Sequence, residues 1–179
     1  MTDIPRSAKE IDGMLHELAD TIMQAIDNWN EIVFIGIRSG GVLVAKNVVA
    51  LLEERTGKKI PLGALDIALY RDDLSKIRFY PEVRRTDIPF SVDDKTVILV
   101  DDVLHTGRSV RAAIDHIVDL GRPMRIYLMV LFDRGGREFP IQADFIGKTI
   151  ELGDDKIIKL ETSKDAQLII EVISSEVSR

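Results

Sequence analysis

Cysteine is absent from the 179-residue chain, which excludes disulfides and thiolate zinc sites. The three histidines, at positions 16, 105 and 116, are too scattered for a metal-binding motif. No apolar run approaches the roughly 20 residues that cross a bilayer, and Met1–Pro5 lacks the basic and apolar layout of a signal peptide. We therefore expect a cytoplasmic protein that is neither exported nor inserted in a membrane.

An excess of positive charge is absent as well, because 24 Lys and Arg stand against 30 Asp and Glu, a formal net charge of −6. This balance works against indiscriminate binding to polyanions, so any RNA site has to be local. A hydrophobic content of 45% with 30% charged residues is typical of a globular protein. We expect one domain that covers residues 1–179.

Hydrophobic periodicity predicts strands and helices that alternate along most of the chain. Ser7 and Glu10 form a capping-box pattern at the start of the first helix. Such alternation is typical of an α/β fold with a mostly parallel central sheet flanked by helices, in which ligands collect at the carboxyl ends of the strands. The expected helices are Ser7–Trp29, Val42–Arg55 and Ser109–Leu120, and the expected strands are Glu31–Ile37, Leu62–Leu69, Val97–Val100 and Arg125–Phe132.

Two segments do not follow this alternation. The polar stretch 71–95 contains Pro81 and Pro89 without a sustained period, which predicts a mobile loop that covers an anion. Residues 133–179 are expected to form a small hood over the site, because their β-like runs are too broken for another strand–helix–strand unit. These runs are Phe145–Ile150, Lys156–Leu160 and Leu168–Ile173.

The most informative stretch joins a buried strand, two adjacent carboxylates and the start of a helix. Adjacent carboxylates repel each other unless a cation or hydroxyl donors occupy the space between them. The residues after them open a helix whose N–H groups and positive dipole end favour a phosphate. A ligand with sugar hydroxyls and a phosphate is therefore predicted. The stretch consists of Val97, Ile98, Leu99, Val100, Asp101, Asp102, Val103, Leu104, His105, Thr106, Gly107, Arg108 and Ser109.

Competing phosphate motifs do not occur. The chain has neither the Gly-x-x-x-x-Gly-Lys-Ser/Thr pattern nor a Gly-x-Gly-x-x-Gly pattern after a strand, which excludes NTPases and dinucleotide-binding proteins of those types. A receiver-like domain that binds magnesium through Asp101 and Asp102 is a weaker alternative. Acid pairs of that type are not followed by Thr-Gly-Arg-Ser at the start of a helix.

The stretch 97–109 resembles the phosphoribosyl pyrophosphate (PRPP) binding motif of type I phosphoribosyltransferases. Nearly the whole chain is similar to the PyrR family of bifunctional pyrimidine-operon regulators and uracil phosphoribosyltransferases. The resemblance implies the conversion of uracil and PRPP to UMP and pyrophosphate, with Mg²⁺ as cofactor. It is carried, in order, by Gly36–Gly41, Leu65–Ser75, Val97–Ser109, Leu120–Pro123, Asp133–Glu138 and Asp144–Lys148.

The resemblance also implies roles for individual residues. Asp101 and Asp102 hold the ribose hydroxyls as catalytic residues, and all of 97–109 belongs to the PRPP site. No side chain binds Mg²⁺ directly, since PRPP and water carry it. The pyrophosphate site comprises Arg38, Ser39, Gly40, Gly41, Arg71 and Arg84, with Arg85 as a catalytic residue that neutralises the leaving group, and the uracil site comprises Arg134, Ile157 and Ile158.

His105 departs from the family, in which tyrosine is usual at this position. Two interpretations stay open. The imidazole could accept the proton of uracil N1, or it could be a tolerated substitution at an exposed place.

The alternative to an enzyme is a UMP-sensing regulator that binds pyr leader RNA. The first helix argues against it, with five acids between positions 10 and 27 against Lys9 and His16, as does Gly136, where RNA-binding members can carry histidine. A basic surface is still available from Arg122, Arg125, Arg137 and Lys148. We also expect a homo-oligomer, because the apolar faces of the first helix and Val42–Leu52 exceed what one sheet face covers.

Overall fold

The computed structural model describes residues 4–174 except 6, 71–84, 154 and 164–166. Three helices and seven strands, with two short 3₁₀ turns, make up the described part. The helices are α1 (Ala8–Ala25), α2 (Gly40–Thr56) and α3 (Arg108–Leu120), and the 3₁₀ turns are Trp29–Glu31 and Ala68–Tyr70. The strands are β1 (Ile32–Ile37), β2 (Leu62–Leu65), β3 (Thr96–Leu104), β4 (Arg125–Asp133), β5 (Phe145–Thr149), β6 (Lys156–Thr162) and β7 (Leu168–Ser174).

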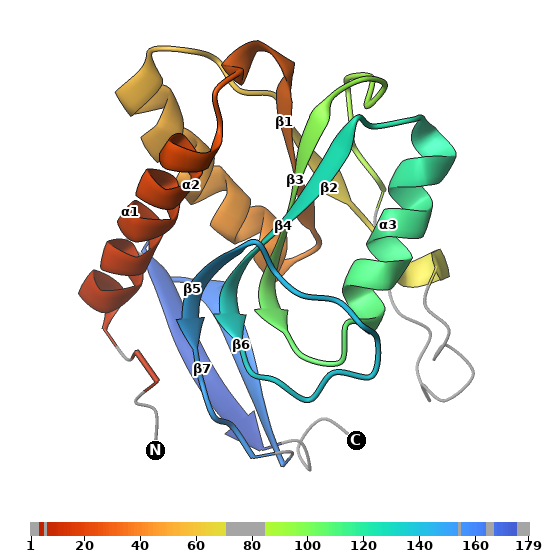
Figure 1. The fold of residues 1–179 in the computed structure, drawn as a ribbon. Coiled ribbons are helices and arrows are strands. Elements are labelled where there is room, and N and C mark those ends of the chain that lie inside the picture. The colour runs from red at the N-terminus through yellow and green to blue at the C-terminus, as the bar shows by residue number, and fades with distance from the viewer. Residues whose placement is uncertain (1–3, 6, 71–84, 154, 164–166, 175–179) are drawn as a thin grey trace.

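The central sheet has five strands in the order β2-β1-β3-β4-β5, and every neighbouring pair is parallel. Helices α1 and α2 cover one face of this sheet and α3 covers the other (Figure 1). The second face is completed by Val92, which is buried with α3. The expected α/β fold with a parallel sheet flanked by helices is confirmed.

The first helix is shorter than its hydrophobic pattern. Its N-terminus has the expected capping box, in which Ser7 Oγ accepts from Glu10 N at 3.2 Å and Glu10 Oε2 accepts from Ser7 N at 3.0 Å. Extension of the helix to Trp29 is wrong, because the backbone at Ile26 is extended. Asn28 then caps the short 3₁₀ turn through its side chain, which accepts from the N–H of Asn30 at 3.1 Å.

Strand β3 extends beyond its expected end at Val100. Both acids of the informative stretch lie within it, since β4 continues beside it and pairs Asp101 with Val130 and Leu104 with Asp133. Strand β2 instead ends at Leu65, before the expected Leu69. There the Asp66 carboxylate accepts from the N–H of Ala68 at 2.8 Å, which favours a turn over further strand.

The stretch expected to form the hood divides between two sheets. Strand β5 joins the central sheet beside β4, although no helix connects the two, and Phe145 is buried in the core at 4% exposure. Strands β6 and β7 form a separate antiparallel pair. Their buried side chains, Ile158, Leu160 and Leu168, belong to the same core as α1 and α2.

The segment 71–95 is described only from Arg85 onward, so its first part lies outside the described residues. The later part is attached to the edge of the sheet. Asp87 and Ala64 exchange backbone hydrogen bonds of 2.7 and 2.8 Å, and Thr86 Oγ1 accepts from Asp66 N at 3.2 Å.

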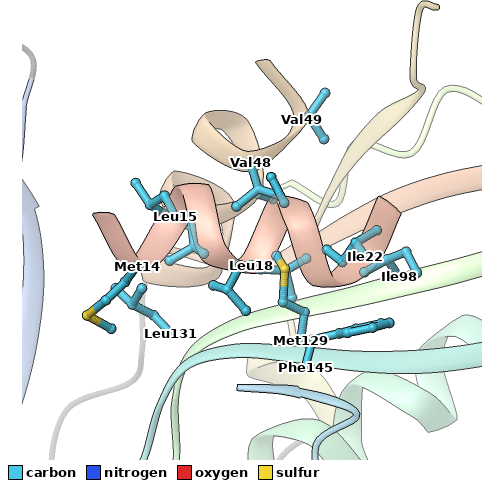
Figure 2. Packing of buried hydrophobic residues seen from close by; sticks show 14 of the residues in the cluster. Met14, Leu15, Leu18, Ile22, Val48, Val49, Ile98, Met129, Leu131 and Phe145 are labelled. Atoms are coloured by element: carbon cyan, nitrogen blue, oxygen red, sulfur yellow. The ribbon is translucent and has the colours of Figure 1, made fainter. Parts of the chain in front are cut away.

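The apolar face of α1 is covered within a single chain. Figure 2 shows Leu15, Leu18 and Ile22 of this helix among side chains of α2 and the sheet, including Val48 and Met129. All three α1 residues are at most 3% exposed. The apolar excess on which the expected homo-oligomer depended is therefore explained by internal packing, and the oligomer stays a prediction.

We predict that Leu18→Ala lowers the free energy of unfolding by about 2–5 kcal/mol, because the substitution leaves a cavity in this packed core. Gln24→Ala on the exposed side of the same helix is the control and should change stability by less than about 0.5 kcal/mol. Urea unfolding of the three proteins measures both values. Equal stability of the two variants would contradict the described packing.

Candidate functional site

The carboxyl ends of β3, β4 and β5 meet at one edge of the sheet, on the side where β6 and β7 lie (Figure 1). Parallel strands in adjacent positions necessarily end at the same edge, and loops from different parts of the chain converge there. Three of these connections carry residues that the sequence assigns to a ligand: 38–41 after β1, 105–109 after β3 and 134–141 after β4.

The acid pair lies at the end of β3 with little access to solvent. Asp101 is 7% exposed and Asp102 is half-buried. Asp101 Oδ1 accepts from the N–H of Asp102, and Asp102 Oδ1 accepts from the N–H of Val103, both at 3.0 Å. Burial raises the pKa of the Asp102 carboxyl, although the hydrogen bonds to its charged form act in the opposite direction.

The turn after β1 lies directly against this acid pair. A Cβ on Gly40 would overlap the Asp102 carboxylate and would be 2.9 Å from Asp102 Cβ. A Cβ on Gly41 would be 2.9 Å from the Cα of Asp101. The backbone of this turn approaches β3 only because both positions are glycine. The expected pyrophosphate turn and the expected ribose-binding acids are thus brought together.

Other features of this turn come from its first residues. Arg38 donates its backbone N–H to the carbonyl of Leu65 at 2.9 Å, and the Arg38–Ser39 peptide bond is cis. The Nε of Arg38 is buried and has no hydrogen-bond partner in the described part of the chain. Helix α2 then begins at Gly40 without a side-chain cap, so its first N–H groups face the same edge of the sheet.

The turn after β3 begins α3 in the same way. Gly107 has a φ of +88° and precedes the first helical residue, with no side-chain cap. Thr106 Oγ1 accepts from the N–H of Arg108 at 3.3 Å. Ser109 lies half-buried in the first turn of the helix. The helix is 13 residues long, and the positive end of its dipole points at the place where the sequence predicts a phosphate.

Arg108 does not point at that place. Its guanidinium forms an ion pair with Glu138 and lies 5.2 Å from the ring centre of Phe139. The carbonyl of Thr106 accepts from the N–H groups of Glu138 and Phe139 at 2.9 and 3.0 Å. The connection after β4 therefore holds the predicted phosphate turn from outside, through backbone and side chain together.

Arg137 is a structural residue of this edge that the sequence does not identify. Its Nη1 donates to the carbonyls of His105 and Gly135 at 2.9 and 3.1 Å, and its Nε donates to that of Ile141 at 2.9 Å. It also pairs with Asp133. Burial acts to raise the pKa of the Asp133 carboxyl, but the hydrogen bonds from the Arg137 guanidinium and the Gly135 N–H outweigh it, so the pKa is lowered. Asp133 and Arg137 are four residues apart at the end of a strand, where this spacing does not bring side chains together as it does on a helix, so the sequence carries no signal for the pair.

This internal engagement corrects the proposed basic surface. The Arg137 guanidinium donates to backbone carbonyls and forms an ion pair with a carboxylate, so it is wrong to count it among the cations available to RNA. Arg125 donates to the Tyr127 hydroxyl at 2.6 Å at the opposite end of β4. The other two members of that set, Arg122 and Lys148, are exposed and half-buried.

Arg134 connects the end of β4 to the backbone at the start of β6. Its Nη1 donates to the carbonyl of Lys156 at 2.9 Å, and its Nη2 donates to that of Gly153 at 3.1 Å. These carbonyls lie just before Ile157 and Ile158 on β6. The side chain of Ile158 is buried in the core at 6% exposure, and that of Ile157 faces outward at 36%. Because only one of these two side chains is exposed, a base can contact both residues together only through their backbone groups.

The remaining predicted residues divide into three groups. Val97, Ile98, Leu99, Val100 and Leu104 are at most 1% exposed, so their side chains hold the strand in the core and do not face a ligand, while Val103 is half-buried. Arg85 is exposed and precedes the contact of Thr86 with the end of β2. Arg71 and Arg84 lie outside the described residues.

The described residues contain no group of three or more His, Cys, Asp or Glu side chains close enough to hold a metal ion. In that same part of the chain, no helix is long and apolar enough to span a membrane. A cavity of about 560 Å³ lies elsewhere, between α1, α2 and the start of β7, and none of the predicted site residues lines it.

Known proteins are similar to this chain in sequence and in fold. Residues 1–166 match the family described as phosphoribosyl transferase domain. The protein named "Bifunctional protein PyrR" from Thermus aquaticus is 44% identical over 158 residues, 88% of this chain and 87% of its own. The protein of the same name from Chloroflexus aurantiacus is 52% identical over 144 residues, 80% and 79% of the two chains.

Solved structures with much lower identity have the same fold. A hypoxanthine-guanine phosphoribosyltransferase from Bacillus anthracis has a TM-score of 0.71 at 19% identity, with 97% of this chain and 99% of that chain covered. The hypoxanthine phosphoribosyltransferase of Trypanosoma cruzi has a TM-score of 0.67 at 16% identity, with 94% and 95% covered. At this identity, the likeness establishes the arrangement of the elements.

The raised pKa of Asp102 leads to a prediction about stability. Folding favours the protonated form of this carboxyl over the ionised form. The stability that the protonated form contributes is therefore complete below the unfolded pKa of about 3.9 and is lost as the pH rises through the folded pKa. Asp102→Asn has no such loss. Its free energy of unfolding should exceed that of the wild type at pH 7, and the difference should shrink as the pH falls toward about 4.

Urea unfolding at both pH values measures this difference. Asp27→Asn removes an exposed carboxylate outside the site and is the matched control, for which no pH-dependent gain is expected. An Asp102→Asn variant less stable than the wild type at pH 7 would show that the buried carboxylate is stabilised by its surroundings.

Proposed function

Because the chain belongs to the phosphoribosyl transferase domain family and, within it, to the bifunctional PyrR proteins, we propose that it is a uracil phosphoribosyltransferase. The reaction joins N1 of uracil to C1′ of PRPP and releases pyrophosphate, which gives UMP. One observation carries this proposal beyond the family. The glycine turn after β1, the acid pair of β3 and the N-terminus of α3 converge on one sheet edge.

These three groups match the three parts of PRPP. The carboxylates of Asp101, which is buried, and Asp102, which is half-buried, suit the 2′ and 3′ hydroxyls, because hydroxyl donors can satisfy adjacent carboxylate oxygens that otherwise repel each other. The first N–H groups of α3, with the Thr106 and Ser109 hydroxyls, suit the 5′-phosphate. The backbone of Ser39–Gly41 suits the pyrophosphate, since glycine permits oxygens to approach the chain closely.

The chemistry requires charge stabilisation rather than a covalent nucleophile. As pyrophosphate leaves, C1′ becomes electron-poor and negative charge accumulates on the leaving oxygens. Asp101 and Asp102 place negative charge beside the sugar, while Arg38, with Arg71, Arg84 and Arg85 from the following loop, is proposed to neutralise the pyrophosphate. The 5′-phosphate anchors the sugar so that C1′ stays aligned with the base.

The residues present fit a magnesium ion that is held mainly by the substrate. Carboxylate oxygens are hard donors of the kind Mg²⁺ prefers, but two adjacent acids do not make a complete protein site. Asp101 and Asp102 would hold the ion through water and through the diol and pyrophosphate oxygens. When bound, Mg²⁺ supplies charge neutralisation for the leaving pyrophosphate.

Uracil is proposed to lie between Arg134 and the start of β6. Arg134 fixes the carbonyls of Gly153 and Lys156, which sets the position of the backbone that follows. Uracil presents alternating acceptors and donors along its edge, and backbone N–H and C=O groups at Ile157 and Ile158 match such a pattern.

The proposal also includes a cytoplasmic location, consistent with the absence of cysteine.

Asp101→Asn and Asp102→Asn should each lower kcat/KM for PRPP about tenfold to a hundredfold, because a charge-assisted hydrogen bond contributes about 1.5–3 kcal/mol. PRPP-dependent UMP formation from uracil is the assay, with Asp27→Asn as the control of unchanged activity. Turnover with hypoxanthine or orotate but none with uracil would reassign the substrate. The absence of turnover with any of these bases would contradict the proposed enzymatic activity.

A UMP-sensing RNA regulator is the second candidate, because the relatives carry the name bifunctional. The charges on the described surface of α1 do not favour it. The Arg55 guanidinium donates to Asp20 at 2.6 Å and lies 2.9 Å from His16 Nδ1, so this cation is paired with α1 itself. Arg137 is engaged internally as well.

We therefore predict that pyr leader RNA is bound no more tightly than a scrambled RNA of equal length at about 150 mM salt, with or without UMP. Gel-shift titrations of both RNAs provide the comparison. A shift specific for the leader and strengthened by UMP would establish the regulator, whatever the result of the enzyme assay.

A further inference from the structure

The end of β2 lies between two segments that the proposed function assigns to pyrophosphate. On the side of β1, the carbonyl of Leu65 accepts from the backbone N–H of Arg38 in the glycine turn at 2.9 Å. On the free edge of β2, Asp87 and Ala64 exchange backbone hydrogen bonds of 2.7 and 2.8 Å in an antiparallel bridge. Because the bridge is antiparallel, Arg85 lies toward the carboxyl end of β2, at the sheet edge where the site residues converge.

A side-chain hydrogen bond fixes the residue that follows Arg85. Thr86 Oγ1 accepts from the N–H of Asp66, directly beyond the end of β2, at 3.2 Å. The segment also packs closely on the strand, because a Cβ on Gly63 would be 2.9 Å from Ile88 Cγ1. Arg85 itself is exposed. Its side chain therefore extends from a backbone that is attached on one side to the edge of the sheet.

The peptide of Asp66 is held from its other side by α3. Its carbonyl lies 3.2 Å from Nδ1 of His116, and because a carbonyl oxygen only accepts, Nδ1 carries the hydrogen of this bond. The imidazole stacks on the ring of Tyr70 with 4.2 Å between the ring centres and 12° between the planes. The Tyr70 hydroxyl donates to Asp119 of the same helix at 3.0 Å. His116 is therefore a donor whose ring is fixed in orientation.

Helix α3 thereby contacts both ends of the proposed PRPP site. Its first turn, which begins at Arg108, is proposed to bind the 5′-phosphate, and His116 lies about two turns later, roughly 12 Å along the axis. Figure 1 shows the 3₁₀ turn that contains Tyr70, in yellow, beside this helix. Because a packed helix is rigid over this length, the bond from His116 fixes the Asp66 peptide relative to the phosphate end of the site.

Resting on the proposed function, we infer that Thr86 and His116 are positioning residues for Arg85, whose proposed role is to neutralise the leaving pyrophosphate. Thr86 fixes the backbone from which the Arg85 side chain extends. His116 fixes the Asp66 peptide that donates to Thr86. The two residues thus act on the pyrophosphate end of PRPP and not on its sugar, its 5′-phosphate or the base.

Thr86→Val keeps the shape of the side chain but removes the acceptor of the Asp66 N–H. We expect the affinity for magnesium pyrophosphate to fall about threefold to tenfold, the effect of one lost hydrogen bond, while the Kd for UMP changes by less than about twofold. UMP is unaffected because it contains no pyrophosphate. Titration calorimetry with each ligand measures both values. Thr21→Val makes the same replacement on the exposed side of α1 and should change neither affinity.

His116→Phe tests the bond on the other side of the Asp66 peptide. Phenylalanine keeps a ring that can stack on Tyr70 but donates no hydrogen bond to the carbonyl. The affinity for magnesium pyrophosphate should again fall about threefold to tenfold, with UMP binding unchanged. Val118→Ala, at a position of α3 that is 57% exposed, is the control on the same helix and should bind both ligands as the wild type does.

A double-mutant cycle shows whether Thr86 acts through Arg85. Arg85→Gln should weaken pyrophosphate binding, and Thr86→Val should cause no additional loss in the Arg85→Gln background. Additive losses of binding free energy would overturn the inference, as would an Arg85→Gln variant that binds pyrophosphate like the wild type. Equal weakening of UMP and pyrophosphate binding by Thr86→Val would also overturn it, because that result indicates a general structural role.

Failure of the proposed function gives a different result. The wild-type protein would then form no UMP from uracil and PRPP, while the pyrophosphate titrations would still show whether Thr86 acts through Arg85. A wild-type protein that forms UMP, with a Thr86→Val variant that binds pyrophosphate normally, would overturn the inference alone.

Discussion

The close approach of the turn after β1 to the acidic end of β3 is the contact on which the site depends. Gly40 and Gly41 bring backbone to within van der Waals distance of Asp102 and Asp101, where any side chain would collide. This approach also depends on the sheet, because β1 and β3 are parallel neighbours whose carboxyl ends coincide. Backbone N–H groups and carboxylates are thereby held at one place without a flexible side chain between them.

A second set of contacts makes the site rigid from the side of β4. The guanidinium groups of Arg137 and Arg134 donate hydrogen bonds to backbone carbonyls. Arg137 fixes the strand end that carries His105, and Arg134 fixes the backbone at the start of β6. Arginine suits this role because its planar donors can satisfy several carbonyls at once.

Local signals in the sequence predicted the helices, most strands and the layered α/β architecture. The acid pair followed by Thr106 and Gly107 also predicted the chemistry of the ligand, because those residue types have few other uses at the end of a buried strand. The predictions from the sequence were wrong where contacts with neighbouring strands determine the length or the position of a strand. β3 continues through its acids because β4 pairs with them, and Phe145 joins the central sheet because a free edge of β4 lies beside it.

Residues close together in the chain were enough to predict the fold class, the family and the start of α3 where a phosphate is proposed to bind, because periodicity, capping and turn chemistry act over a few residues. Which charges are available to a ligand depends on contacts between distant segments. The sequence assigned Arg108 to the PRPP site and Arg137 to a basic surface, yet Arg108 pairs with Glu138 and Arg137 pairs with Asp133. The packing of His105 on Gly136 joins residues far apart in sequence, and such a contact exists only once β3 and β4 are paired.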